Sequence, residues 1–212
     1  MRTVGWGVRT AGRIAAISLA AATLGVGVGS SAAAACPGAN PCPYTSIANT
    51  FGRAGTSFFN VQPGVAVDSA GNQYLTDWNN NRIIKFSSSG AFAWAVGANN
   101  ASGQSGTGSG QFNHPYELRV SNDGLHVYIA DGFDNRVEEL NTSDGSPVRM
   151  WGRNGGDGSA GSGVGEFNRP VGIGIDSTGN VYVSDCLNNR VQEFDSGGNF
   201  IAQFGSAGYG NG

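Results

Sequence analysis

The sequence is poor in the residues that carry most catalytic and metal-binding chemistry. Its 212 residues include two His, three Cys and two Met, and only 13% of the residues are charged. Neither His114 nor His126 has a second His at ligand spacing, so the pattern predicts no metal site. No glycine-rich stretch leads into Gly-Lys-Ser or Gly-Lys-Thr, which excludes a phosphate-binding loop. We therefore expect no catalytic residue, no metal and no cofactor, and we predict that the chain is not an enzyme.

Long hydrophobic runs are also absent. The most apolar stretch, residues 14–28, is interrupted by Ser, Thr and Gly and is too short to span a membrane. Arg residues precede it, and small residues ending in Ala33-x-Ala35 follow it. This order predicts a secretory signal peptide over residues 1–35. We expect the mature chain to be secreted or held in the cell envelope without a membrane span; a retained membrane anchor is the alternative.

Basic residues become scarcer once the signal peptide is removed. Arg2, Arg9 and Arg13 are three of the 12 basic residues, which leaves nine against 15 acidic residues and a net charge of −6. An acidic domain lacks the basic patch that nucleic-acid binding requires. The composition therefore predicts no nucleic-acid partner.

The few cysteines fall into a close pair and a single residue. Cys36 and Cys42 enclose a Pro- and Gly-rich loop, and in an oxidising compartment this spacing favours a disulfide that closes residues 36–43. Cleavage after Ala35 would make Cys36 the first residue, which raises a lipid anchor as an alternative; Ala33 stands where the bacterial lipoprotein pattern prefers Leu. Cys186 is left over, and we interpret it as an unpaired thiol in a turn.

What the sequence does contain is one motif written three times. Asp-x-x-Asn/Asp-Asn-Arg recurs every 54 residues, and its invariant ends are Asp77 and Arg82, Asp131 and Arg136, and Asp185 and Arg190. The Asp can accept hydrogen bonds from backbone N–H groups of the turn, and the Arg can reach the Asp or a carbonyl across a hairpin. Every copy would need the same contact, so we interpret the motif as structural. Function is then expected where the copies differ.

Each copy reads as four short strands joined by tight turns, and no segment has helical periodicity. The predicted strands are residues 64–68, 73–77, 82–86 and 92–96, then 117–120, 126–131, 136–140 and 147–151, then 172–176, 181–185, 190–194 and 200–204. Glycine-rich joins separate the copies, and each join ends in Phe-Asn-x-Pro, at residues 112–115 and 167–170. Four-stranded sheets repeated along a chain bury their faces by radial stacking, which predicts an all-β β-propeller.

The copies resemble the NHL-repeat family of β-propellers, and the glycine-rich joins are similar to those of secreted bacterial members. The resemblance is strongest over residues 165–194, which read Gly-Glu-Phe-Asn-Arg-Pro-Val-Gly-Ile-Gly-Ile-Asp-Ser-Thr-Gly-Asn-Val-Tyr-Val-Ser-Asp-Cys-Leu-Asn-Asn-Arg-Val-Gln-Glu-Phe, and it extends over residues 44–212. It implies four-stranded antiparallel blades at about residues 60–97, 112–152 and 167–205. It also implies a propeller that serves mainly as a binding platform, without a universal catalytic set.

Three blades are fewer than the four to eight that close a propeller. Residues 44–52 resemble a fourth strand without its three partners, which is how a propeller joins its two ends. We therefore expect an incomplete ring of three blades plus an N-terminal closing strand, and hypothesise that the sequence is a fragment of a longer protein.

Binding is expected at the loops where the copies diverge. The turns after the motif Asp carry Trp78, Phe133 and Leu187, which could form a binding rim for a protein or a glycan, or could pack on the neighbouring blade. The predicted function is an exported, non-catalytic scaffold. The alternatives are part of a secreted metal-dependent propeller lyase or hydrolase whose site lies mostly in other blades, and the sensor or adhesive ectodomain of a larger envelope protein.

Overall fold

The computed structural model describes residues 64–206, which belong to one compact unit, and leaves residues 1–63 and 207–212 outside the described part. The predicted signal peptide, the disulfide between Cys36 and Cys42, and the closing strand over residues 44–52 all fall outside it. The three repeat copies lie within the described residues.

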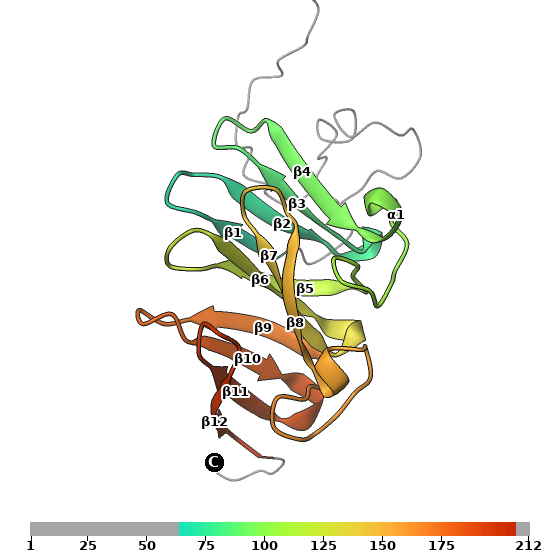
Figure 1. Ribbon diagram of the computed structural model, residues 1–212, viewed down its shortest axis with the longest axis vertical. Coiled ribbons are helices and arrows are strands. Elements are labelled where there is room, and N and C mark those ends of the chain that lie inside the picture. Colours follow the sequence, from blue (N-terminus) through green and yellow to red (C-terminus); the bar gives the residue numbers. More distant parts are fainter. Residues whose placement is uncertain (1–63, 207–212) are drawn as a thin grey trace, which may run out of the picture. The chain divides into compact units, whose positions relative to one another are not determined.

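The described residues form three four-stranded antiparallel sheets, each with its strands in chain order (Figure 1). Blade 1 holds β1 (Val65–Val67), β2 (Gln73–Asp77), β3 (Arg82–Phe86) and β4 (Phe92–Gly97). Blade 2 holds β5 (Pro115–Val120), β6 (His126–Asp131), β7 (Arg136–Asn141) and β8 (Pro147–Gly152). Blade 3 holds β9 (Pro170–Ile175), β10 (Val181–Asp185), β11 (Arg190–Phe194) and β12 (Phe200–Phe204). The prediction of all-β, four-stranded antiparallel blades is confirmed.

The structure departs from the predicted elements at the turns. Each motif turn is a short 3-10 helix, namely η1 (Trp78–Asn80), η2 (Gly132–Asp134) and η4 (Cys186–Asn188), and the joins carry α1 (Ala98–Ala101) and η3 (Arg153–Gly155). These single turns are too short to leave a periodic pattern in the sequence. The strands β5 and β9 begin at Pro115 and Pro170, two residues before their predicted starts. Proline has no N–H to give to a ladder, so its position at the start of a strand costs no hydrogen bond.

The hydrophobic core lies between the blades. One cluster joins Tyr74, Ile83 and Trp94 of blade 1 to Phe112 and Leu118 of the next repeat, and a second cluster joins blade 2 to blade 3 in the same way. Phe112 and Phe167 open the two Phe-Asn-x-Pro segments, and both are fully buried. Each such phenyl ring contributes about 1.5–3 kcal/mol of hydrophobic stabilisation.

The topology sorts the loops into two groups. Because successive strands are antiparallel, the turns between second and third strands lie at the same end of the blades as the joins, which we call the join end. The remaining turns lie at the opposite end, the tip end. All three motif turns and both Phe-Asn-x-Pro segments are therefore brought together at the join end.

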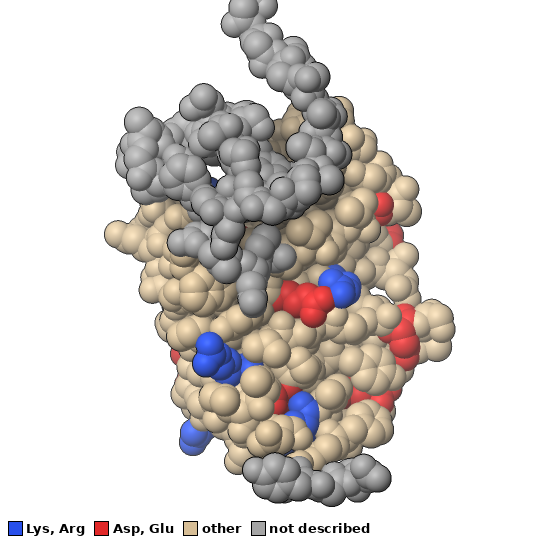
Figure 2. All heavy atoms as spheres, turned by 180° about the vertical axis from the view of Figure 1, so that it is seen from behind, with Lys and Arg blue, Asp and Glu red and all other residues tan. Residues whose placement is uncertain are grey.

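The charged surface is sparse. On the face drawn in Figure 2, the described residues carry few Lys, Arg, Asp and Glu side chains, and the two signs are intermixed. Among the residues that the structure describes, no helix has the length and apolar character needed to cross a membrane.

Candidate functional site at the join end of the blades

The three Asp–Arg pairs of the motif have the same geometry in each blade. Arg Nε lies 2.7 Å from Asp Oδ2 in the pair Arg82–Asp77, 3.0 Å in Arg136–Asp131 and 2.8 Å in Arg190–Asp185. All three Asp side chains are buried. Each pair connects the end of the second strand to the start of the third, and therefore closes the 3-10 turn between them.

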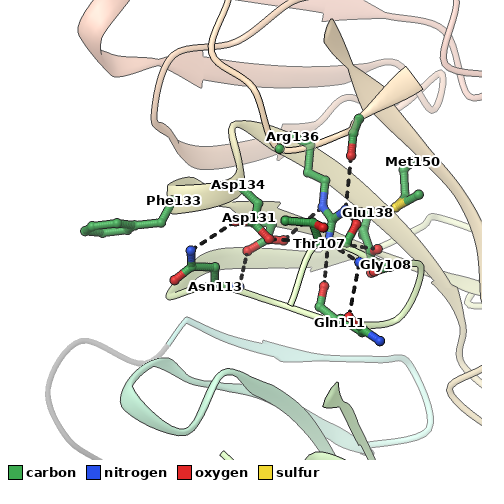
Figure 3. A network of polar contacts seen from close by, with 12 residues as sticks. Thr107, Gly108, Gln111, Asn113, Asp131, Phe133, Asp134, Arg136, Glu138 and Met150 are labelled. Carbon is green, nitrogen blue, oxygen red and sulfur yellow. Dashed lines mark hydrogen bonds and ion pairs between the residues drawn. The ribbon is translucent and has the colours of Figure 1, made fainter. Parts of the chain in front are cut away.

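The pair in blade 2 is the centre of a larger buried network (Figure 3). The guanidinium of Arg136 donates to the carbonyl oxygens of Thr107, Gly108 and Gln111 in the preceding join, and to that of Gly156 in the following join. In blade 3, Arg190 donates to the carbonyls of Ser162, Gly163 and Glu166 in its own preceding join. The motif Arg thus holds a glycine-rich join, which has no strand partners of its own, against the blade.

The blade 2 network contains more carboxylates than cations. Besides Asp131, Asp134 and Glu138 lie 3.7 Å and 3.4 Å from Arg136 Nη2. Burial raises the pKa of Asp131 well above its usual value, raises the pKa of Asp134, and raises the pKa of Glu138 to about 7, each against the opposing attraction of Arg136. Desolvation penalises the ionised form more than one shared guanidinium can offset.

Blade 3 shows that the extra acid is not required by the fold. Gln192 occupies the place of Glu138, and its Oε1 accepts from Gly165 N as the carboxylate of Glu138 accepts from Gly110 N. The amide makes this contact with the join without a charge. The excess of carboxylates is therefore present in blade 2 and absent from blade 3.

The second Asn of the motif connects one blade to the next. Asn81 accepts from the backbone N–H of His114, and Asn135 accepts from that of Arg169. His114 and Arg169 have φ values of 54° and 58°, a left-handed conformation that is rare outside glycine and asparagine. The side chain of the preceding blade thus holds the variable residue of each Phe-Asn-x-Pro segment in a conformation that directs the chain into the next blade.

The network also fixes the turn that carries Phe133. Asn113 donates from its backbone N–H to Asp131 at 2.8 Å and from its side chain to Asp134 at 3.0 Å, and its carbonyl accepts from Phe133 N at 3.2 Å. Phe133 itself points away from the network (Figure 3), and 44% of its surface is exposed. A rigid polar interior therefore presents an apolar side chain to solvent.

Phe133 lies within a group of ring and cationic side chains, which we call the rim cluster: Trp78, His114, Tyr116, Phe133 and Arg169. The Trp78 and His114 rings are 4.2 Å apart, and those of His114 and Phe133 are 4.6 Å apart. The rings of Tyr116 and Phe133 are stacked with centroids 6.4 Å apart.

Arg169 completes the rim cluster from blade 3. Its guanidinium lies 4.9 Å from the centroid of the Phe133 ring, and its Nη2 donates to Tyr116 Oη at 2.9 Å. The Tyr116 hydroxyl raises the pKa of Arg169, and burial lowers the pKa of His114. Near neutral pH the rim cluster therefore presents one cation and mostly neutral imidazole among aromatic rings.

Gly132 explains why the blade 2 turn differs from the others. A Cβ at this position would clash with the Tyr116 ring and would lie 2.9 Å from the Pro170 carbonyl oxygen. The other blades carry Trp78 and Cys186 at the same place in the turn. Glycine is thus needed in blade 2 because the Tyr116 ring and the next strand occupy the space of a side chain.

The predicted rim residues are only partly brought together. Trp78 and Phe133 have ring centroids 6.2 Å apart, whereas Leu187 is 54% exposed in the blade 3 turn and belongs to no cluster in the described part of the chain. The sequence prediction missed His114, Tyr116 and Arg169. These three residues could have been found from the strand order, because in an antiparallel blade the joins and the motif turns lie at the same end.

Comparison with known proteins identifies the repeat. Residues 167–194 match the family model described as the NHL repeat. The human protein "NHL repeat-containing protein 3" is 35% identical over 118 residues, which cover 53% of this chain and 31% of that protein. The chain thus spans less than a third of this relative's length.

Solved structures of enzymes share the fold. A streptogramin B lyase aligns with a TM-score of 0.50 at 14% identity over 69% of this chain and 41% of its own. The dihydro-heme d1 dehydrogenase NirN aligns with a TM-score of 0.51 at 14% identity over 71% of this chain and 30% of its own. Identities this low carry the fold alone.

These structures overturn the prediction that the chain is not an enzyme. That prediction was wrong because it relied on the scarcity of His and on reading the propeller as a binding platform, whereas the same fold carries enzymes. The repeat, in contrast, is the one that the residues indicated. Residues 167–194 carry an NHL repeat, and the four-stranded sheets of the described residues have the fold of β-propeller blades.

Proposed function

We propose that the chain binds a protein partner through the rim cluster at the join end of its blades. The observation that carries the proposal is the grouping of Trp78, Tyr116, Phe133 and Arg169, contributed by three blades, around a ring that is 44% exposed. Trp, Tyr and Arg are the residues that most often dominate the energy of protein interfaces.

Pre-organisation supports the same proposal. The turn of Phe133 is held by Asn113 and by the buried carboxylates Asp131 and Asp134, so the ring loses little freedom when a partner covers it. A side chain that is already ordered costs less conformational entropy on binding. Loops of blades 1, 2 and 3 also meet here, which gives a partner a surface wider than one blade.

Affinity capture with matched variants tests the proposal. The bait is the mature chain in wild-type form and as Phe133→Ala, Arg169→Ala and Leu187→Ala, and the extract is the extracellular fraction of the organism that encodes it. Leu187 is the control, because it is an exposed apolar residue of the equivalent turn in blade 3. A partner retained by the wild type and Leu187→Ala but lost from the other two supports the proposal. Equal retention by all four baits contradicts it.

We further propose that the chain is exported. The support is the basic, apolar and small-residue order of residues 1–35, followed by Cys36 and Cys42. Intact mass spectrometry of the mature chain should show a first residue of Cys36 and a mass lower by a pair of hydrogens than the reduced form. An acyl adduct on Cys36 would favour the lipid anchor, and a full-length mass would refute export by cleavage.

A further inference from the structure

A polar cleft of about 370 Å³ lies between blades 2 and 3 at the tip end, away from the rim cluster. Its walls come from the first turns of blades 2 and 3, from β6, β7, β8 and β9, and from the last turn of blade 3. The side chains that matter most are His126, Tyr128, Glu139, Arg149, Ser177 and Thr178.

An ion pair between a buried carboxylate and a partly exposed guanidinium forms one wall of the cleft. Glu139 is 1% exposed; its Oε1 lies 3.2 Å from His126 Nδ1, and its Oε2 lies 2.5 Å from Arg149 Nε. Arg149 also donates from Nη1 to the Gly197 carbonyl, yet 36% of its side chain remains exposed. A guanidinium has five N–H donors, so Arg149 keeps donors for a bound molecule.

The first turn of blade 2, which lines this cleft, differs in its residues from the first turns of blades 1 and 3. The turn-closing bond Gly124 N to Ser121 O matches Gly71 N to Asp68 O in blade 1 and Gly179 N to Asp176 O in blade 3. Ser121 therefore stands in the place of an Asp in both other blades.

In blades 1 and 3 that Asp closes the turn with an Asn and a Tyr. Asp68 accepts from Asn72 and from Tyr74 Oη at 2.8 Å and 3.0 Å, and Asp176 accepts from Asn180 and Tyr182 Oη at 3.1 Å and 3.3 Å. Blade 2 has Ser121, His126 and Tyr128 at these places. The Ser121 hydroxyl accepts from the backbone N–H of His126 and donates to Asp123, and the Tyr128 hydroxyl lies 3.5 Å from the Ser196 carbonyl instead.

The junction of blades 1 and 2 fills the corresponding space with an apolar ring. Trp94 pairs with Lys85 across β3 and β4 as Arg149 pairs with Glu139 across β7 and β8. Trp94 is 8% exposed and donates to the Thr142 carbonyl of blade 2. Blade packing is therefore satisfied by an indole at this place, and the ionic residues of the second junction are not a requirement of the fold.

We propose that the cleft between blades 2 and 3 binds a neutral saccharide. Arg149 is balanced by Glu139, and Asp123 adds a negative charge, so the lining disfavours an anion. Among the lining residues only Ile175 is aliphatic, which disfavours an apolar ligand.

A saccharide matches the hydrogen-bonding groups that remain. Each sugar hydroxyl both donates and accepts, and the cleft offers guanidinium donors beside hydroxyl and imidazole groups. Burial raises the pKa of Tyr128 to about 12, so its hydroxyl stays protonated and can donate. Together these groups suit a ligand whose own groups both donate and accept hydrogen bonds.

Saturation-transfer NMR tests the proposal with the full mature chain and a panel of glucose, galactose, N-acetylglucosamine, maltose and chitobiose. The first variant, Ser121→Asp with His126→Asn, installs the turn residues of blades 1 and 3. The second variant, Glu139→Gln, keeps the shape and removes the charge. The control is Glu193→Gln, because Glu193 pairs with Tyr182 across β10 and β11 of blade 3 and accepts from its hydroxyl.

At least one sugar should bind the wild type and the control equally, and its affinity should fall about tenfold or more in both test variants. The first variant replaces the hydroxyl and imidazole groups that line the cleft, and the second removes the carboxylate that holds Arg149. Thermal unfolding followed by circular dichroism confirms that each variant is folded before it is scored. The proposal is overturned if no sugar of the panel binds, or if binding persists in the two test variants. Because the cleft and the rim cluster lie at opposite ends, neither result bears on the proposed protein partner.

Discussion

Replacing Glu138 with glutamine should stabilise the protein, and the gain should grow with pH. Glu138 is fully buried, and burial raises its pKa from 4.5 to about 7. A group whose folded-state pKa is raised gives its full stability below its unfolded pKa and loses it as pH rises through the folded value. The free energy of unfolding of the wild type should therefore fall between about pH 4.5 and 7 because of this residue.

The expected gain in the free energy of unfolding follows from the pKa shift of Glu138. About 2.5 units of difference in pKa correspond to roughly 3 kcal/mol at pH 8, and to about 1 kcal/mol at pH 5. Glutamine resembles the protonated acid, and Gln192 shows that an amide can accept from the join glycine at this place. Glu138→Gln should thus be more stable than the wild type by those amounts.

Urea denaturation at pH 5, 6, 7 and 8 measures the difference. The mirror variant Gln192→Glu in blade 3 should lose stability over the same pH range. The reasoning is refuted if Glu138→Gln is no more stable than the wild type at pH 8, or if its gain does not change with pH.

Three further substitutions have expected outcomes. Arg136→Ala should lower the free energy of unfolding by about 3–5 kcal/mol in urea titrations, because it leaves buried carboxylates without their cation; a loss under 1 kcal/mol would count against the network. Asn135→Ala should cost about 1 kcal/mol more than Asn189→Ala, because Asn135 bonds to Arg169 N and Gly158 O, whereas the Asn189 side chain has no hydrogen bond within residues 64–206. Equal losses would show that the contact between blades contributes nothing. Gly132→Ala should cost about 1–3 kcal/mol in thermal or urea unfolding, and Cys186→Ala at the matching place should be tolerated; tolerance of both would contradict the close contact with Tyr116.

The sequence was informative about the blades because their signals are local and repeated. Residues 181–185 alternate in hydrophobicity and are bounded by turns rich in Gly and Asn, and this pattern recurs in each copy. Both ends of β2, β3, β6, β10, β11 and β12 were therefore predicted to the residue. The starts of β5 and β9 were missed because proline is depleted in strands, although the first position tolerates it.

The candidate sites were less predictable because they depend on which loops meet. Phe133 and Trp78 stood out as apolar residues in variable turns, but Tyr116 and Arg169 join them only through contacts between blades. The cleft at the tip end could not be predicted from the spacing of His126 and His114 in the sequence. His126 lies beside Glu139, which pairs with Arg149, and these residues come from other strands of the same sheet.

The central claim is that the shared residues of the copies hold the blades together and that the diverging ones bind. The most direct test is the affinity of the captured partner for Phe133→Ala, measured by calorimetry alongside the variant's free energy of unfolding. The account predicts a loss of roughly 2 kcal/mol or more in binding, as for an interface hot spot. Stability should fall by only about 1 kcal/mol, because Phe133→Ala gives up partly exposed ring contacts. Unchanged affinity, or a loss of binding matched by an equal loss of stability, would contradict it.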